Sequence, residues 1–176
     1  MIKEAIIPLA GLGTRLLPFS KILPKELLPL GNKTILEHIL DECLGAGIKK
    51  IILVISKRKK FIKNYLYPDP YLLKYLKNKK DYKSIQKLKI LDRYRNKIRF
   101  VYQNSPKGLG DAVLAAQSVI KNKYFLLVLP DDIIIKENCS KKIINIHNKY
   151  HSSVIAAKKV KSSEVSRYGI VKYSKK

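Results

Sequence analysis

The residues with the clearest capacity for chemistry stand near the start of the chain. Gly11 and Gly13 follow an apolar run over residues 5–9, which predicts a buried strand ending in a glycine-rich turn. Such a turn allows positive φ and close backbone approach, so that unpaired N–H groups can face an anion. Arg15 adds donors suited to phosphate oxygens, and Lys25 adds a further positive charge. This spacing predicts a polyphosphate site.

Each of these features also has an ordinary structural explanation. Most paired glycines are plain turns, and a single arginine or lysine is usually a solvated surface residue. The turn does not match the dinucleotide-binding fingerprint because position 16 is leucine, and no Gly-Lys-Ser or Gly-Lys-Thr run follows to make a P-loop. The combined pattern, G-x-G-T-R-L-x-P followed by P-K-E-L-L-P, is much more specific than any of its parts.

Two later loops carry side chains that would complement a phosphate site. Asp131 follows four apolar residues and a proline, and a carboxylate at the end of a buried strand is a frequent Mg²⁺ ligand. Gln103 offers an amide that can hydrogen-bond to the edge of a pyrimidine, and Gly108 can admit a flat base close to the backbone. The alternatives are a turn-capping aspartate, an ordinary strand-end glutamine and a turn glycine.

Together these residues suit nucleotidyl transfer, in which the protein contributes mainly positioning and charge stabilisation. The amides near Gly11 and Gly13, with Arg15, would hold a triphosphate. Lys25 would offset charge on the α-phosphate and on an attacking sugar phosphate. Mg²⁺ on Asp131 would bridge the two.

Strands and helices alternate around these loops. We predict strands at 2–9, 51–55, 98–102, 124–129 and 153–160, and a last one beginning over 167–171. Helices are predicted after a capping box at Thr34 and Glu37, over 111 to about 120, and from Asn138 or Ser140 through 150. This order predicts an α/β fold with a largely parallel sheet. Since ligands bind at the carboxyl ends of such strands, the loops 10–15, 103–110 and 130–132 should gather at one edge.

Two stretches depart from this alternation. Residues 16–33 are rich in proline, and we expect an ordered extended segment lying over the sheet. Residues 58–97 are polar, rich in lysine and tyrosine, and interrupted by prolines. Their apolar spacing predicts two amphipathic helices that pack beside the sheet as a hairpin.

Composition limits the class of protein. The chain has 176 residues, 46% of them hydrophobic, which is enough for one domain with a core. No apolar run approaches the roughly 20 residues needed to span a bilayer, and no signal peptide is expected. The two cysteines, Cys43 and Cys139, lack metal-ligand spacing. We expect a cytoplasmic protein with no membrane partner.

The net charge of +24 invites a nucleic-acid interpretation. The lysines are spread over several clusters, however, and are interleaved with isoleucine, asparagine and tyrosine. That mixture is typical of the codon bias of an A- and T-rich genome. We therefore expect weak polyanion affinity and no specific nucleic-acid partner.

The motifs resemble those of the sugar-1-phosphate nucleotidylyltransferases, and most closely the bacterial UTP–glucose-1-phosphate uridylyltransferases. The resemblance lies in I-P-L-A-G-L-G-T-R-L-L-P-F-S-K-I-L-P-K-E-L-L-P-L, in Q-N-S-P-K-G-L-G-D-A-V-L and in L-P-D-D. The insertion separates this group from the related thymidylyltransferases. The resemblance implies a Rossmann-like nucleotide-diphospho-sugar transferase fold, a mostly parallel mixed sheet flanked by helices. It covers residues 1–176 as one nucleotidyltransferase domain, with the helical insertion at 58–97.

The resemblance also implies the base site. Ala10 and Gly11 would contact uracil through the backbone. Gln103 and Gly108 would complete the pocket for the base.

The remaining roles concern the transfer itself. By the resemblance, Arg15 would bind the leaving pyrophosphate, Lys25 would be the catalytic lysine, and Asp131 would hold Mg²⁺. Gly169, in Y-G-I-V, would contact the glucosyl group. The implied reaction joins UTP and glucose 1-phosphate to give UDP-glucose and pyrophosphate.

The family pattern extends further than this chain does. Beyond Gly169 the family has a Glu-Lys pair for the sugar, another aspartate for the metal, and the usual oligomer contacts. We therefore expect an N-terminal part, truncated at the C-terminus, whose sugar-binding part is absent and whose full-length parent would form a homo-oligomer. Two alternatives stay open: a thymidylyltransferase or another enzyme of the same chemistry, and a non-catalytic nucleotide-binding remnant.

Overall fold

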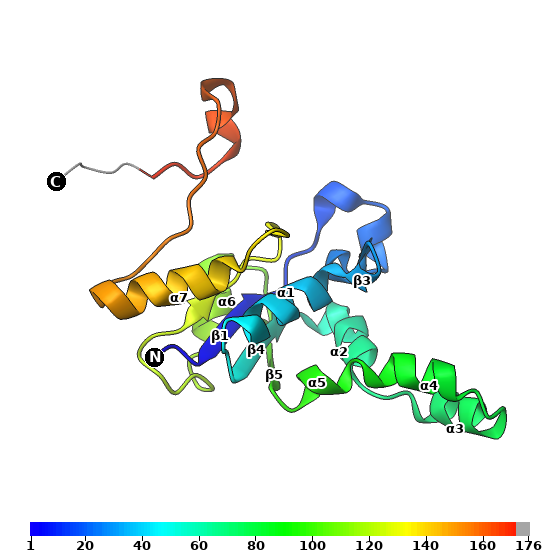
Figure 1. The fold of residues 1–176 in the computed structure, drawn as a ribbon. Helices are drawn as coiled ribbons and strands as arrows, with labels where there is room; N and C mark the ends of the chain where they lie inside the picture. The colour runs from blue at the N-terminus through cyan, green and yellow to red at the C-terminus, as the bar shows by residue number, and fades with distance from the viewer. Residues whose placement is uncertain (172–176) are drawn as a thin grey trace.

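A four-stranded parallel sheet lies at the centre of the computed structural model, which describes residues 1–171 (Figure 1). The strands are β1 (Glu4–Pro8), β4 (Lys50–Ile55), β5 (Ile98–Tyr102) and β6 (Leu126–Leu127), in the order β5-β4-β1-β6. Each strand runs parallel to its neighbours, so the carboxyl ends share one edge of the sheet. The predicted α/β class and parallel crossovers are confirmed.

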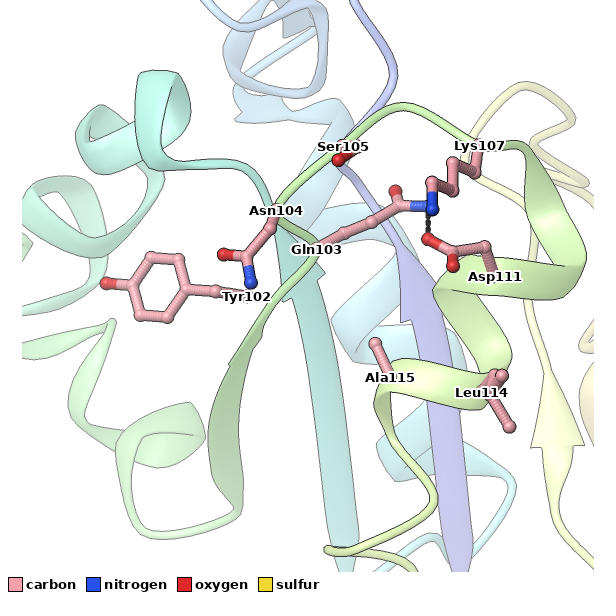
Figure 2. Close-up of a pocket in the computed structure, with 8 residues that line it drawn as sticks. All are labelled: Tyr102, Gln103, Asn104, Ser105, Lys107, Asp111, Leu114 and Ala115. Carbon is pink, nitrogen blue, oxygen red and sulfur yellow. Dashed lines mark hydrogen bonds between the residues drawn. The ribbon is translucent and has the colours of Figure 1, made fainter.

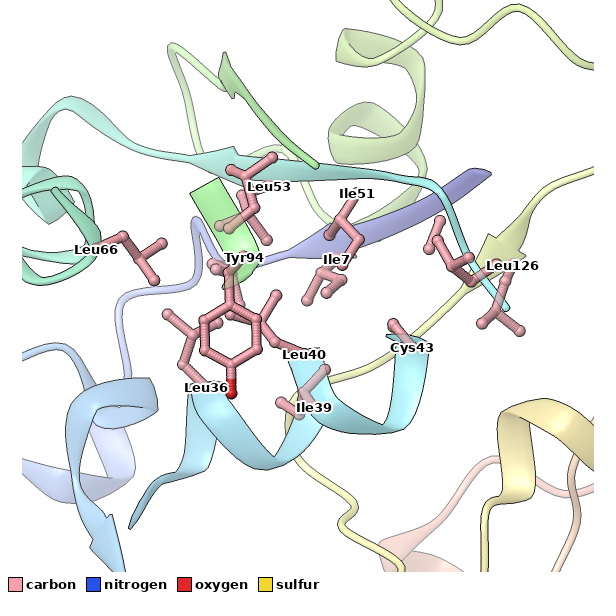
Figure 3. Close-up of a cluster of buried hydrophobic side chains, with 14 of the residues drawn as sticks. Ile7, Leu36, Ile39, Leu40, Cys43, Ile51, Leu53, Leu66, Tyr94 and Leu126 are labelled. Atoms are coloured by element: carbon pink, nitrogen blue, oxygen red, sulfur yellow. The ribbon is translucent and has the colours of Figure 1, made fainter. Parts of the chain in front are cut away.

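Apolar side chains on β1 and β4 pack against helices on both faces of the sheet. Because side chains alternate along a strand, Ile7 and Leu53 join one cluster, whereas Ile6 and Val54 join the other. The larger cluster packs against α1 (Ile35–Gly45) and α7 (Cys139–Tyr150) (Figure 3). The smaller cluster packs against α6 (Leu109–Ala115). Burial on both faces explains the continuous apolar runs in the sequence.

The helix caps form as the sequence predicts. The Thr34 hydroxyl accepts from the Glu37 N–H, and the Glu37 carboxylate accepts from the Thr34 N–H, which completes a capping box. At the other end Gly47 adopts φ +83°, just beyond α1. Asn138 caps α7 by accepting from the Lys141 N–H at 2.7 Å.

The insertion over residues 58–97 contains four helices where the sequence predicts two. They are α2 (Lys60–Leu66), α3 (Pro70–Asn78), α4 (Tyr82–Lys89) and α5 (Asp92–Arg95). The hairpin α3–α4 projects from the body (Figure 1), with Lys80 at φ +55° in its turn. The additional helices α2 and α5 form because Leu66 and Tyr94 are fully buried in the main core.

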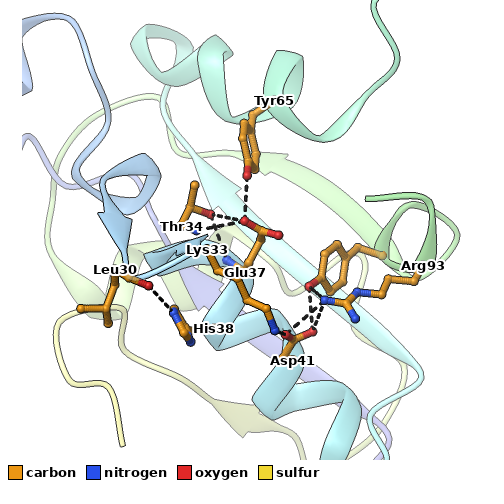
Figure 4. Close-up of polar contacts among 9 residues, drawn as sticks. Leu30, Lys33, Thr34, Glu37, His38, Asp41, Tyr65 and Arg93 are labelled. Atoms are coloured by element: carbon orange, nitrogen blue, oxygen red, sulfur yellow. Dashed lines mark hydrogen bonds and ion pairs between the residues drawn. The ribbon is translucent and has the colours of Figure 1, made fainter. Parts of the chain in front are cut away.

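Two carboxylates of α1 anchor the insertion at both ends (Figure 4). Near its start, Tyr65 donates from its hydroxyl to Glu37 at 2.8 Å. Near its end, Tyr94 donates to Asp41 at 2.7 Å, and the Arg93 guanidinium pairs with the same carboxylate at 3.0 Å. The hairpin therefore projects from a fixed base.

Two predicted elements are shorter than expected. Strand β6 covers 126–127 and not 124–129, and within residues 1–171 it pairs with β1 alone. Helix α6 ends at Ala115 and not near 120, and the chain continues in tighter turns. Glu4 then holds the next loop, accepting from the N–H groups of Lys121 and Asn122 at 2.9 and 2.8 Å.

The two predicted C-terminal strands are not observed. Residues 153–160 are irregular, η5 (Ser162–Arg167) is a 3₁₀ helix, and 168–171 are irregular. This segment leaves the body beyond α7 (Figure 1). An apolar extended stretch becomes a strand when a neighbour pairs with its backbone, and within residues 1–171 no strand lies alongside it. Ile155 is accordingly 75% exposed.

The segment 16–33 is ordered but not extended. It forms the 3₁₀ turns η1 (Thr14–Leu16), η2 (Phe19–Lys21) and η3 (Lys25–Leu27), then an antiparallel hairpin of β2 (Pro29–Leu30) and β3 (Lys33–Thr34). Pro18 and Pro24 stand directly before two of these turns, where a fixed φ favours a tight turn.

Among residues 1–171, no helix has the length and apolar character required to cross a bilayer.

Candidate nucleotide site

The three loops predicted to meet do meet, at the carboxyl edge of the sheet. They enclose a pocket of about 410 Å³. The residues that line it include six of the predicted site residues: Ala10, Gly11, Lys25, Gln103, Gly108 and Asp131. These come from the ends of β1, β5 and β6 and from η3, so the parallel sheet brings distant segments of the sequence together.

The glycine turn after β1 presents free backbone donors. Gly13 adopts φ +69°, and a Cβ built there would lie 3.2 Å from the Cβ of Ser20. It would also lie 3.9 Å from Cδ of Lys25, so the lysine stem runs beside the turn. In the described part of the chain, the N–H groups of residues 11–13 donate to no backbone or side-chain acceptor. These donors are available to an anion.

Lys25 and Asp131 form an ion pair across the pocket, although 106 residues separate them in sequence. The Lys25 side chain is 25% exposed and that of Asp131 is 62% exposed. A surface pair of this kind contributes little to stability, so either group can exchange its partner for a ligand. The positive charge lies where a phosphate held by the glycine turn would need it.

Glu26, the residue after Lys25, forms a buried ion pair that holds the backbone next to Lys25 in place. Glu26 is 1% exposed, and the Lys59 ammonium donates to both of its carboxylate oxygens, at 2.9 and 2.8 Å. Burial lowers the pKa of Lys59, while the charge and hydrogen bonds of Glu26 oppose that shift. The sequence gives no signal for Lys59, because this lysine stands in a run of basic residues that otherwise face solvent.

Gln103 is buried at 5% exposure where β5 ends. Its Nε2 donates to the carbonyl oxygen of Gly108 at 3.1 Å and to the Asp111 carboxylate at 2.7 Å. Gly108 adopts φ +96°, a backbone conformation that residues other than glycine rarely adopt. Gln103 and Asp111 also line a second pocket of about 390 Å³ (Figure 2). Asp111 was likewise missed; an acidic residue in the first turn of a helix usually has only a dipole role.

Three predicted residues lie outside the pocket lining. Gly13 shapes the turn beside it, and Arg15 is exposed on η1, immediately after the turn. Gly169 lies in the segment that leaves the body beyond α7 (Figure 1), and a Cβ built on it would meet nothing within 4 Å. The structure therefore does not bring Gly169 to the site, and its sugar contact stays a prediction.

The acidic side chains suit a metal ion that arrives with its substrate. Within residues 1–171, no three His, Cys, Asp or Glu side chains are grouped as metal ligands. Asp131 and Asp132 are adjacent and exposed. Mg²⁺ is commonly held by one or two carboxylates together with waters and substrate phosphates. The donor set fits Mg²⁺ bound to a nucleotide.

The comparison with protein families agrees with this geometry. The family model described as nucleotidyl transferase matches residues 4–176. The chain belongs to the nucleotidyl transferase family. The chain is 39% identical, over 171 residues, to a protein named putative UTP–glucose-1-phosphate uridylyltransferase from Methanocaldococcus jannaschii. It is 37% identical, over 171 residues, to a UTP–glucose-1-phosphate uridylyltransferase from Bacillus subtilis.

Both alignments include 97% of this chain but only 60% and 58% of the relatives. The chain thus spans about three fifths of the length of the curated relatives it matches. A UDP-glucose pyrophosphorylase complexed with UDP-glucose superposes with a TM-score of 0.81 at 30% identity, covering 97% of this chain and 62% of the other. A UTP-bound enzyme from Acinetobacter baumannii gives 0.79 at 34% identity, covering 86% and 54%.

Proposed function

We propose that this chain forms the nucleotide-binding part of a uridylyltransferase, which joins UTP and glucose 1-phosphate to give UDP-glucose and pyrophosphate. The observation that carries the proposal is the pocket that Gly11 of the glycine turn, Lys25 and the buried Gln103 line together, next to the free N–H groups of the turn. The names of the relatives support the choice of UTP and of the glucosyl acceptor.

The chemistry follows from the order of groups along the pocket. Gln103, Gly108 and the backbone at Ala10 and Gly11 would receive the base, which directs the triphosphate toward the glycine turn. A phosphate oxygen of the sugar phosphate attacks the α-phosphorus, and the bond from that phosphorus to the bridging oxygen of the β-phosphate breaks. Lys25 would neutralise charge on the pentavalent centre, where such stabilisation matters most.

The leaving group and the metal have proposed places as well. Arg15, exposed beyond the turn, would bind the departing pyrophosphate, since its guanidinium forms paired hydrogen bonds to phosphate. Asp131, once released by Lys25, would hold Mg²⁺, which supplies charge neutralisation for the phosphate oxygens.

Calorimetry with UTP and Mg²⁺ tests binding, and pyrophosphate release after adding glucose 1-phosphate tests turnover. We expect UTP to bind in the presence of Mg²⁺. Lys25→Ala should reduce turnover more than nucleotide affinity. Lys74→Ala, which removes the same charge from the exposed surface of α3, is the matched control. Absence of UTP binding in the folded wild-type chain would refute the proposal.

A second candidate function is nucleotide binding without transfer. Gly169 is not among the residues that line the pocket, which favours this candidate, because the resemblance assigns the glucosyl contact to Gly169. UTP binding without pyrophosphate release would support this candidate. Release of pyrophosphate at a rate that depends on glucose 1-phosphate would exclude it.

A further inference from the structure

The amide group of Gln103 is held in one orientation by two acceptors. Its Nε2 donates to the carbonyl oxygen of Gly108 at 3.1 Å and to Oδ2 of Asp111 at 2.7 Å. Figure 2 shows the amide nitrogen directed at Asp111 and the carbonyl oxygen directed away from it. An amide nitrogen has two hydrogens, so both are used within the protein.

The reversed orientation is excluded by electrostatics. A flipped amide would place its carbonyl oxygen 2.7 Å from the Asp111 carboxylate and 3.1 Å from the carbonyl of Gly108. Neither group can donate a hydrogen bond, since a carboxylate and a peptide carbonyl only accept. At 5% exposure, little water reaches Gln103 to relieve that repulsion.

The two acceptors are themselves fixed by the fold. Gly108 turns the chain with φ +96° and directly precedes α6, and its carbonyl also accepts the first helical hydrogen bond, from the Ala112 N–H at 3.2 Å. Asp111 stands in the first turn of the same helix. Ala112 in turn packs in the core beneath the sheet. The amide is therefore preorganised before any ligand arrives.

We infer that Asp111 is a positioning residue that makes Gln103 a hydrogen-bond acceptor toward the base, so that the site selects uracil over cytosine. The inference rests on the proposed function. With both amide hydrogens used, Gln103 has only its carbonyl oxygen Oε1 to offer in the pocket it shares with Ala10, Gly11 and Gly108.

The chemistry of the pyrimidines makes this orientation selective. Uracil carries an N–H at N3, which can donate to Oε1. Cytosine carries an unprotonated N3, an acceptor that would face Oε1 without a hydrogen between them. A buried acceptor left facing another acceptor keeps its desolvation cost without gaining a hydrogen bond, so we expect a CTP complex about tenfold weaker.

Asp111→Asn tests the inference with an isosteric change. An asparagine amide can accept or donate, so it no longer forces the orientation of Gln103. UTP and CTP affinities are measured by calorimetry for the wild type and the variant. We expect UTP to bind about tenfold more tightly than CTP in the wild type, and this ratio to fall several-fold in Asp111→Asn. Asp111→Ala serves as a second variant, with the same expectation.

The ratio of UTP affinity to CTP affinity distinguishes a positioning role of Asp111 from a purely structural one. Loss of helix stability at Asp111 would weaken both nucleotides equally and leave the ratio unchanged, which would overturn the inference. Asp92→Asn, the same substitution on α5, should leave both affinities unchanged. Equal binding of UTP and CTP by the wild type would refute the inference while leaving nucleotide binding intact. Failure of the wild type to bind either nucleotide would refute the proposed function, and the inference with it.

Discussion

The Lys59 ammonium bonds both carboxylate oxygens of Glu26, at 2.9 and 2.8 Å, and Glu26 directly follows the proposed catalytic lysine in the chain. The pair ties the start of the insertion to the turn η3. Because Glu26 cannot move without breaking a buried ion pair, the backbone at Lys25 is fixed. Lys25 therefore has only its own side-chain torsions to adjust when a phosphate binds.

Removing one partner of the Glu26–Lys59 pair should lower the free energy of unfolding much more than replacing both partners with uncharged residues. Lys59→Met leaves the Glu26 carboxylate buried and unpaired, and we expect a loss of about 3–5 kcal/mol in the free energy of unfolding. The double variant Glu26→Gln, Lys59→Met should recover most of it, since no buried charge is left. Urea unfolding of the two single variants and the double variant measures the cycle. Additive losses in the double variant would contradict the coupling.

Stability should depend on pH through Glu4. Burial alone would raise its pKa, but hydrogen bonds from Lys50, Lys121 and Asn122 outweigh burial and lower it from 4.5 to about 2. A carboxyl whose pKa is lower in the folded state stabilises the fold above pH 4.5 and loses that effect as the pH falls toward 2. The shift corresponds to about 3 kcal/mol. Urea unfolding across this range should show the loss, and Glu4→Gln should show a correspondingly flatter profile.

Gly13 and Gly11 should respond differently to a methyl group. At Gly13, φ is +69° and an added Cβ would lie 3.2 Å from the Cβ of Ser20. Gly13→Ala should therefore lower the free energy of unfolding by about 1–2 kcal/mol. At Gly11 an added Cβ meets nothing within 4 Å, so Gly11→Ala should leave stability nearly unchanged. Equal thermal unfolding of the two variants would show that the turn is not strained at Gly13.

Removing the Arg15 guanidinium should weaken UTP binding about tenfold, the loss expected for one exposed charge-assisted contact to phosphate. The fold should not change, because Arg15 is exposed. Calorimetry on Arg15→Ala measures the effect, with Lys74→Ala as the control for net charge. Unchanged UTP affinity in Arg15→Ala would remove Arg15 from the phosphate site.

Asp131→Asn should abolish the strengthening of UTP binding by Mg²⁺, because an amide is a much poorer Mg²⁺ ligand than a carboxylate. Binding without Mg²⁺ should be retained or improved, since Lys25 loses its ion-pair partner and is free for phosphate. Titrations with and without Mg²⁺ give the comparison. Full Mg²⁺ dependence in the variant would show that the metal binds elsewhere.

The sequence was sufficient to locate the four strands that form the sheet and most of the pocket. Strands such as 51–55 are apolar without interruption, and their carboxyl ends must share an edge once the crossovers are parallel. That alone brings Gln103 and Asp131 near the glycine turn. The capping box at Thr34 and Glu37 could also be predicted from the sequence, because its two hydrogen bonds join residues only three positions apart.

What the sequence could not supply depends on contacts between distant residues. Lys59 lies among other lysines, and only the tertiary fold places it on Glu26. Residues 153–160 have the composition of a strand, yet pairing requires a neighbour that local pattern cannot reveal. The number of helices in the insertion was predicted wrongly for the same reason. The short helix α5 is stabilised by Tyr94, which packs into a core formed by other elements.

The projecting α3–α4 hairpin has a consequence for local unfolding. The structure describes both helices in full: no side chain of α3 is buried, and Ile85 is the buried residue of α4. Opening the hairpin exposes little apolar surface, so its free energy of opening should be far below that of the sheet. Its amide hydrogens should exchange with solvent well before those of β1 and β4. Because Glu37 and Asp41 hold the base of the insertion, such opening would stop there and leave the pocket intact.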